Sequence, residues 1–198
     1  MAGNSVKRVC VFCGSNNGFR PQYADAATAM AAALVQRGLG LVYGGGNVGL
    51  MGTIADAVIR QGGKVIGVIP DALVERELAH GDVTEMIVVR SMHERKAKMA
   101  ELADAFIAMP GGFGTFEEFC EIVTWAQLGL HRKPCGLLNV EGYYDPLLAL
   151  FDHAVSEGFL RPANRLLVIQ ESDPGRLLEN LSSYTLPVTE KWISRNDS

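Results

Sequence analysis

The sequence predicts an α/β fold, a single-domain doubly wound, Rossmann-like parallel sheet with helices on both faces. Short apolar segments rich in β-branched residues alternate along the chain with longer segments of helical periodicity. Strands buried on both faces of a parallel sheet appear as continuous apolar runs, and their alternation with helices predicts right-handed βαβ units. In such a sheet ligands bind beyond the carboxyl ends of the strands. We therefore expect a site in the turns that follow the strands.

The expected strands are short apolar runs rich in β-branched residues. In chain order they are "VCVFCG" (9–14), "GLVYGG" (40–45), "KVIGVIP" (64–70), "EMIVVR" (85–90), "ADAFIAMP" (103–110), "PCGLLNV" (134–140) and "RLLVIQ" (165–170). The expected helices lie between them, with apolar residues at helical spacing. They cover 21–38, 49–63, 91–103, 114–130, 143–158 and 173–184.

Length and composition favour one soluble globular domain over residues 1–198. The chain has 198 residues, of which 48% are hydrophobic and 20% charged, enough for a sizeable core. We place this core at about 6–184 and a polar tail at 185–198, with Trp192 packing the tail against the body. No run approaches the length of a membrane span, and the apolar run near the N-terminus is too short for a signal peptide. We expect a cytoplasmic protein that binds no membrane.

The net charge of −4 and the pI near 5.6 provide no general positive field for a nucleic-acid backbone. Any anionic ligand must therefore bind at a local site. The cysteines Cys10, Cys13, Cys120 and Cys135 show no disulfide spacing. Cys10 and Cys13 lie three apart in an expected strand, so their side chains point to opposite faces and belong to the core. We expect neither a metal nor a cofactor.

Glycine-rich turns follow the first, second and fifth expected strands. They are "CGSNNGFRP" (13–21), "YGGGNVGLMG" (43–52) and "PGGFGT" (110–115). The second is similar to a dinucleotide fingerprint but lacks the acidic residue expected about 20 residues later, and no P-loop Gly-Lys-Ser/Thr is present. Backbone amides in such turns bind phosphate, most strongly at a helix N-terminus. The turns therefore predict a site for a mononucleotide or a sugar phosphate.

The helix after "PGGFGT" adds carboxylates where a phosphate would lie. Helical periodicity places Glu117, Glu121 and Thr124 on one face and Glu118 one residue aside, toward the strand ends. The expected apolar face consists of Phe116, Phe119, Cys120, Val123 and Ala126. Carboxylates beside a bound phosphate need a positive group nearby, and the preceding helix supplies Arg95, Lys96 and Lys98.

The segments "GGGNVGLMG", "SMHERKAKM" and "PGGFGTFEE", the last fitting P-G-G-x-G-T-x-x-E, resemble the Lonely Guy family of cytokinin-activating phosphoribohydrolases, often labelled "lysine decarboxylase". The resemblance runs from about Val9 to Val168. It implies hydrolysis of the N-glycosidic bond of a cytokinin riboside 5′-monophosphate, a homodimer, and Arg95 and Glu118 as the catalytic pair. The substrate-binding residues that it implies are Glu77, Lys96, Gly111, Gly112, Gly114, Thr115, Glu117 and Thr124.

This chemistry gives a reason for carboxylates beside an anion site. Cleavage of a ribosyl–base bond develops positive charge on the sugar, which a carboxylate near C1′ stabilises. Adjacent residues diverge by about 100° on a helix, so we expect Glu118 rather than Glu117 to face C1′. Arg95 either holds Glu118 in place or binds phosphate. The preferred N6 substituent, or plain AMP as the substrate, stays open.

Two other functions are compatible with the sequence. A nucleotide carrier without catalytic activity could use the same glycine turns, since these bind phosphate whether or not chemistry follows. A pyridoxal phosphate-dependent decarboxylase would need a lysine for its Schiff base, and Lys96 is the lysine we would nominate. The presence of both Arg95 and Glu118 favours the hydrolase.

Overall fold

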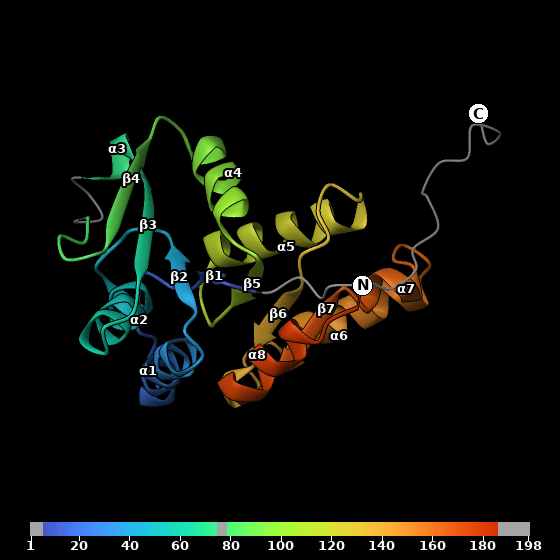
Figure 1. The fold of residues 1–198 in the computed structure, drawn as a ribbon. Helices are drawn as coiled ribbons and strands as arrows, with labels where there is room; N and C mark the ends of the chain where they lie inside the picture. Colours follow the sequence, from blue (N-terminus) through green and yellow to red (C-terminus); the bar gives the residue numbers. More distant parts are fainter. Residues whose placement is uncertain (1–5, 75–78, 186–198) are drawn as a thin grey trace.

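The described part of the chain, residues 6–74 and 79–185 of a computed structural model, forms a seven-stranded sheet in the order β4-β3-β2-β1-β5-β6-β7 (Figure 1). Every neighbouring pair of strands is parallel. The strands are β1 (Arg8–Phe12), β2 (Gly40–Tyr43), β3 (Val65–Pro70), β4 (Glu85–Val89), β5 (Ala105–Ala108), β6 (Cys135–Leu138) and β7 (Val168–Glu171). The predicted doubly wound sheet is confirmed.

The order of the strands creates one topological switch point. From β1 the chain adds β2, β3 and β4 on one side, and β5 then returns to pair with β1 from the other side. The connections that leave β1 and β5 therefore diverge, which opens a crevice beyond their carboxyl ends. The first and third glycine turns follow these two strands.

Helices cover both faces of the sheet (Figure 1). The core on one face contains residues of α1, α2 and α8, and the core on the other contains residues of α4, α5 and α6. No helix within the described ranges is both long and apolar enough to cross a membrane. The helices are α1 (Pro21–Gln36), α2 (Gly49–Arg60), α3 (Asp71–Val74), α4 (Met92–Leu102), α5 (Phe113–Gln127), η1 (Val140–Gly142), α6 (Asp145–Ser156), α7 (Pro162–Arg165) and α8 (Pro174–Ser182).

Strand β1 shows why the cysteine pair is structural. Val9, Val11 and Cys13 pack into the core on one face, whereas Cys10 and Phe12 pack into the core on the other. Burial raises the pKa of both thiols well above its usual value. The prediction that Cys10 and Cys13 are core residues on opposite faces is confirmed.

The expected elements are all present, with boundaries that differ by a few residues, but α3, η1 and α7 are additional. The predicted apolar face of α5 is partly wrong. The buried stripe contains Phe119, Ile122 and Ala126 together with Thr115, whereas Cys120 is exposed. Packing on β5 and β6 rotates the helix relative to the most apolar stripe in the sequence. The prediction for Trp192 lies outside the described residues.

The backbones of the glycine turns contact one another directly. The N–H of Leu50 donates to the carbonyl of Gly14, and the N–H of Gly14 donates to that of Pro110, both at 3.0 Å. Gly49 has a φ of 58°, and a Cβ there would lie 2.2 Å from the carbonyl carbon of Ser15. Glycine is therefore required at this position, because the first and second turns approach each other without room for a side chain.

Gly49→Ala should destabilise the fold much more than Gly62→Ala. Both positions have positive φ (58° and 75°), which costs a non-glycine residue roughly 1–2 kcal/mol. A Cβ at Gly62 meets nothing within 4 Å, whereas a Cβ at Gly49 would overlap the backbone of Ser15. Such overpacking adds typically about 1–3 kcal/mol. Urea midpoints of the two variants measure the difference, and equal losses would contradict the contact between the turns.

Candidate active site

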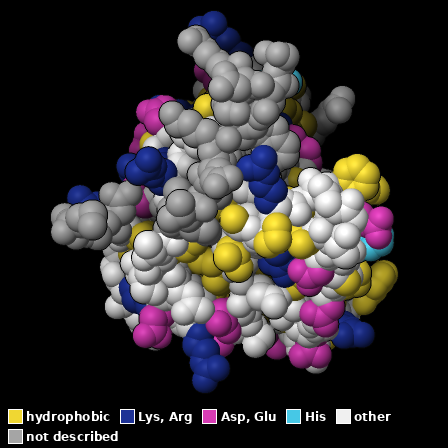
Figure 2. Space-filling model, turned by 90° about the vertical axis from the view of Figure 1, so that its right-hand side faces the viewer, with side chains coloured by type: hydrophobic (Ala, Val, Ile, Leu, Met, Phe, Trp, Pro, Cys, Tyr) yellow, Lys and Arg dark blue, Asp and Glu magenta, His cyan; other side chains and the backbone are white. Residues whose placement is uncertain are grey.

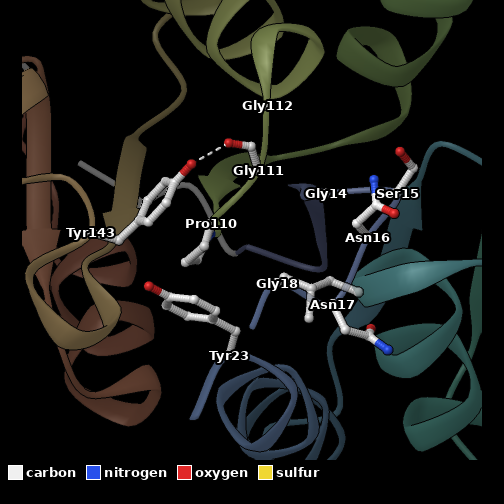
Figure 3. A pocket seen from close by; sticks show the side chains of 11 residues that line it. Gly14, Ser15, Asn16, Asn17, Gly18, Tyr23, Pro110, Gly111, Gly112 and Tyr143 are labelled. Atoms are coloured by element: carbon white, nitrogen blue, oxygen red, sulfur yellow. Dashed lines mark hydrogen bonds between the residues drawn. The ribbon is translucent and has the colours of Figure 1, made fainter. Parts of the chain in front are cut away.

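Two adjacent cavities open beyond the carboxyl ends of β1 and β5, at the switch point. The larger, of about 310 Å³, we call the main cleft; the smaller, of about 210 Å³, we call the tyrosine cavity (Figure 3). Both contact Gly14, Ser15 and Gly112. The main cleft is otherwise lined by Cys13, Met51, Leu73, Met92, Arg95, Phe113, Gly114, Thr115, Glu117 and Glu118. The tyrosine cavity is otherwise lined by Asn16, Asn17, Gly18, Tyr23, Leu50, Pro110, Gly111 and Tyr143.

The N-terminus of α5 forms one wall of the main cleft. Its N-cap is Gly112, which provides no side-chain cap. The first N–H groups of a helix have no partner within the helix, and the helix dipole is positive at this end. The chain approaches closely here, because a Cβ on Gly111 would lie 2.2 Å from the Oγ1 of the buried Thr115. This wall is therefore suited to bind an anion such as phosphate.

Arg95 lies in the first turns of α4, which begins after the N-cap Ser91. Only 6% of Arg95 is exposed. Its Nε donates to the carbonyl of Val68 in β3 at 3.1 Å, and its Nη2 donates to the carbonyl of Gly44, directly after β2, at 3.2 Å. A Cβ on Gly44 would lie 2.1 Å from this Nη2. The absence of a side chain at Gly44 thus makes room for the guanidinium.

The second glycine turn has a packing role that the sequence did not predict. It was expected to supply part of the phosphate site, but among the residues of 43–52 only Met51 reaches the main cleft, and only Leu50 reaches the tyrosine cavity. Gly44 and Gly49 instead allow close packing against Arg95 and Ser15. Among the described residues, those that line both cavities (Gly14, Ser15 and Gly112) belong to the first and third turns.

The guanidinium of Arg95 faces the carboxylate of Glu118. The Nη1 of Arg95 lies 3.8 Å from the Oε1 of Glu118, and their side chains are only 7% and 11% exposed. Water screens such a pair weakly, so the attraction between the two groups is strong. Because the other two nitrogens of Arg95 donate to strand carbonyls, the geometry favours the first of its two predicted roles, which is to hold Glu118 in place.

Lys96 binds two carboxylates of α5. Its Nζ donates to Glu117 and to Glu121, the latter at 3.0 Å. Partial burial lowers the pKa of Lys96, but the hydrogen bonds to the two carboxylates outweigh it, so the net shift of this pKa is upward. The side chain of Glu117 is 53% exposed. The adjacent carboxylates thus differ: Glu117 is at the rim with Lys96, whereas Glu118 is inside with Arg95.

The structure brings most of the predicted site residues together. Arg95, Gly112, Gly114, Thr115, Glu117 and Glu118 line the main cleft, and Gly111 lines the tyrosine cavity. Lys96 contacts the cleft through Glu117. Thr124 lies further along α5, where its hydroxyl donates to the carbonyl of Cys120 and its side chain lines a separate groove. Glu77 lies outside the described residues. The roles of these residues stay predictions.

Several cleft residues were not singled out from the sequence. Ser15 belongs to the first glycine turn, which was noted, but apolar residues such as Leu73 and Met92 carry no sequence signal for a site. The thiol of Cys13 also lines the cleft, and burial, with a smaller contribution from Glu118, raises its pKa. It therefore stays protonated. Within the described ranges no cluster of His, Cys, Asp or Glu has the geometry to hold a metal ion.

A doubly wound parallel sheet with a helix N-terminus at its switch point defines the class of Rossmann-like α/β proteins. Residues 51–181 match the model of a family described as "possible lysine decarboxylase". The chain is also 52% identical over 189 residues to the rice (Oryza sativa subsp. japonica) "probable cytokinin riboside 5'-monophosphate phosphoribohydrolase LOGL2", which covers 96% of this chain and 77% of the rice protein.

The Arabidopsis thaliana "cytokinin riboside 5'-monophosphate phosphoribohydrolase LOG1" is 51% identical over 192 residues, 97% of this chain and 90% of that protein. The chain belongs to this family, the Lonely Guy family, as its motifs predicted. A solved molybdenum cofactor binding protein from Rippkaea orientalis is 22% identical, with a TM-score of 0.68 over 92% of this chain and 98% of that one. At this identity the similarity concerns the fold alone.

Proposed function

We propose that this protein hydrolyses the N-glycosidic bond of an N6-substituted adenosine 5′-monophosphate, releasing the free base, a cytokinin, and ribose 5-phosphate. The observation that carries the proposal is the buried Arg95–Glu118 pair beside the uncapped N-terminus of α5. The activity named for relatives that are about half identical over nearly the whole chain supports the same reaction.

In this proposal the 5′-phosphate binds the amides at the start of α5 and the ribose lies over Glu118. The bond from C1′ to the base breaks, and its electron pair leaves with the base. Glu118 stabilises the positive charge that develops on the sugar and orients the water that adds to C1′. This water gives up one proton as it adds, and the departing base takes up one proton, so the products are the neutral base and ribose 5-phosphate. Arg95 holds the carboxylate in place through their ion pair. The apolar side chains of Leu73 and Met92 offer a surface for the base.

The alternatives explain less of the site. A carrier needs the phosphate-binding turn but has no use for a buried guanidinium–carboxylate pair. A pyridoxal phosphate-dependent decarboxylase needs a neutral lysine amine, whereas Lys96 binds Glu117 and Glu121 and the pKa of its ammonium is raised. The hydrolase uses both the helix terminus and the pair.

A homodimer is part of the proposal. An apolar groove of about 260 Å³ lies between α5, α6 and α7, lined in part by Val123, Phe151 and Phe159, with Phe159 83% exposed. Figure 2, which views this side of the molecule, shows hydrophobic side chains gathered near the centre of the face. Exposed apolar surface of this kind is typical of contacts between subunits. Thr124 lines the same groove, so a second copy bound there would contact it.

We also propose that the protein is cytoplasmic. A cytoplasmic location would give the enzyme access to nucleoside monophosphates.

Release of the free base should depend on the 5′-phosphate, because the uncapped N-terminus of α5 is the phosphate site of this proposal. We expect kcat/KM for N6-isopentenyl-AMP to exceed that for the corresponding riboside by at least about tenfold, the scale of one hydrogen bond to a charged group. Chromatographic separation of bases from nucleotides gives both rates, and AMP measured alongside shows whether the N6 substituent matters. Comparable rates for nucleotide and riboside would contradict the phosphate site, and no base release from any nucleotide would favour the carrier.

Glu118→Gln should lower kcat by roughly 10²-fold or more while nucleotide binding is largely retained, because it removes the charge and keeps the shape. Glu117→Gln should instead raise KM more than it lowers kcat, since Glu117 lies at the rim. Glu101→Gln is the matched control, because Glu101 is exposed and pairs only with Lys98 in the described residues. Steady-state kinetics separate the effects. An active Glu118→Gln beside an inactive Glu117→Gln would reverse the assignment.

A further inference from the structure

The glycine turn 110–112 is held on the side away from the main cleft. The carbonyl of Met109 accepts a hydrogen bond from the hydroxyl of Tyr144 at 2.7 Å, and the carbonyl of Gly111 accepts one from the hydroxyl of Tyr143. Figure 3 shows the Tyr143 hydroxyl pointing to Gly111 across the tyrosine cavity. The carbonyl of Pro110, between them, accepts from the N–H of Gly14. Three consecutive carbonyls are thus fixed in direction.

The direction of a carbonyl determines the direction of the next amide. A trans peptide is planar, so its C=O and its N–H point in opposite directions. The C=O of Gly111 and the N–H of Gly112 belong to one peptide. Because the Gly111 carbonyl points at Tyr143 in the tyrosine cavity, the Gly112 N–H points the other way. Gly112 also lines the main cleft, and among the described residues this N–H has no hydrogen-bond acceptor.

The two tyrosines differ in this respect. Tyr144 holds the carbonyl of Met109, and the next residue is Pro110, which has no N–H to direct. Tyr144 is also almost fully buried, at 1% exposure, whereas Tyr143 is half-buried. The bond of Tyr144 therefore anchors the loop to the core, and the bond of Tyr143 orients an amide of the anion site.

The turn that carries the tyrosines is strained. Glu141 has a φ of 52°, the left-handed region that non-glycine residues seldom adopt, and Gly142 follows with a φ of 70°. Asn139 stabilises the turn, because its Oδ1 accepts from the N–H of Tyr144 at 2.7 Å. Strain of this kind persists only where the surroundings enforce it, and it is common at functional sites. Here the turn places the rings of Tyr143 and Tyr144 beside the glycine turn 110–112.

The ring of Tyr143 is held on two sides. Tyr23 of α1 packs edge-on against it, with ring centroids 5.8 Å apart, and Phe116 of α5 lies at 6.4 Å. These contacts restrict the side chain to an orientation in which its hydroxyl reaches Gly111 (Figure 3). An aromatic ring without the hydroxyl would retain the packing and lose only the hydrogen bond.

We propose that Tyr143 is a positioning residue for the 5′-phosphate, aiming the Gly112 N–H into the main cleft through its hydrogen bond to the Gly111 carbonyl. The inference rests on the proposed function, because it assumes that a nucleotide phosphate binds at the start of α5. It deepens that proposal by adding a residue on η1–α6 that never touches the substrate.

The test compares Tyr143→Phe with Tyr144→Phe and Tyr23→Phe. The affinity for AMP and for adenosine is measured by calorimetry, and kcat and KM are measured with N6-isopentenyl-AMP. We expect Tyr143→Phe to weaken AMP binding and raise KM by roughly tenfold, the scale of one misdirected hydrogen bond to a charged group, with adenosine affinity and kcat little changed. Incorporating 4-aminophenylalanine at position 143 restores a donor and should restore the affinity.

The other variants are matched controls. Tyr144→Phe should lower the melting temperature without changing the preference for AMP over adenosine. Tyr23→Phe should change neither the melting temperature nor the preference for AMP. The hydroxyl of Tyr23 makes no hydrogen bond within the described residues, while its ring lines the same cavity. Unchanged AMP affinity in Tyr143→Phe, an equal loss of preference in Tyr144→Phe, or a Tyr143→Phe variant that does not fold would overturn the inference. A wild type that binds AMP and releases no base refutes the hydrolase alone.

Discussion

The guanidinium of Arg95, buried beneath the ends of β2 and β3, is the group on which the rest of the site depends. A buried charge is tolerated only with partners, and Arg95 has the carbonyls of Val68 and Gly44 and the carboxylate of Glu118. These partners belong to β3, to the turn after β2 and to α5. One side chain therefore ties both halves of the doubly wound sheet together across the switch point. It also explains why the position after β2 has no side chain.

The site contains partial positive charge and negative charge at separate positions that lie close together on α5. In the proposed reaction the start of α5 offers partial positive charge to the phosphate, and its carboxylates, one turn further, offer negative charge to the sugar. Without cations, these carboxylates would repel a phosphate. Arg95 and Lys96 each neutralise a different part of the acidic group, one inside the cleft and one at its rim. A nucleotide bound as proposed would therefore contact the amides of α5 and one carboxylate, with the other acidic charge neutralised by Lys96.

The sequence predicted the sheet, the order of its main elements and the charged residues that line the main cleft. The fold could be predicted from the periodicity of apolar residues, and the site from the glycine turn and the carboxylates that follow it. Both signals lie within short stretches of the sequence. The packing role of the second glycine turn could not be predicted from the sequence. Gly44 and Gly49 are required because they contact Arg95 and Ser15, which lie far from them along the chain. The buried stripe of α5 was misplaced because packing on β5 and β6, rather than residue hydrophobicity, sets its rotation. Tyr143 lacks any local signal, because its partner is 32 residues away.

The direct backbone contacts between the turns have a consequence for protein engineering. Gly14 links the loops after β1, β2 and β5, donating to Pro110 and accepting from Leu50. If one of these loops were replaced by the corresponding loop of a relative, it would have to pack against two loops that fit the original one. The three loops should therefore be exchanged together. The apolar wall near Leu73 and Met92 lies outside these loops. Libraries that aim to change which base is accepted should randomise this wall and leave the interlocked loops intact.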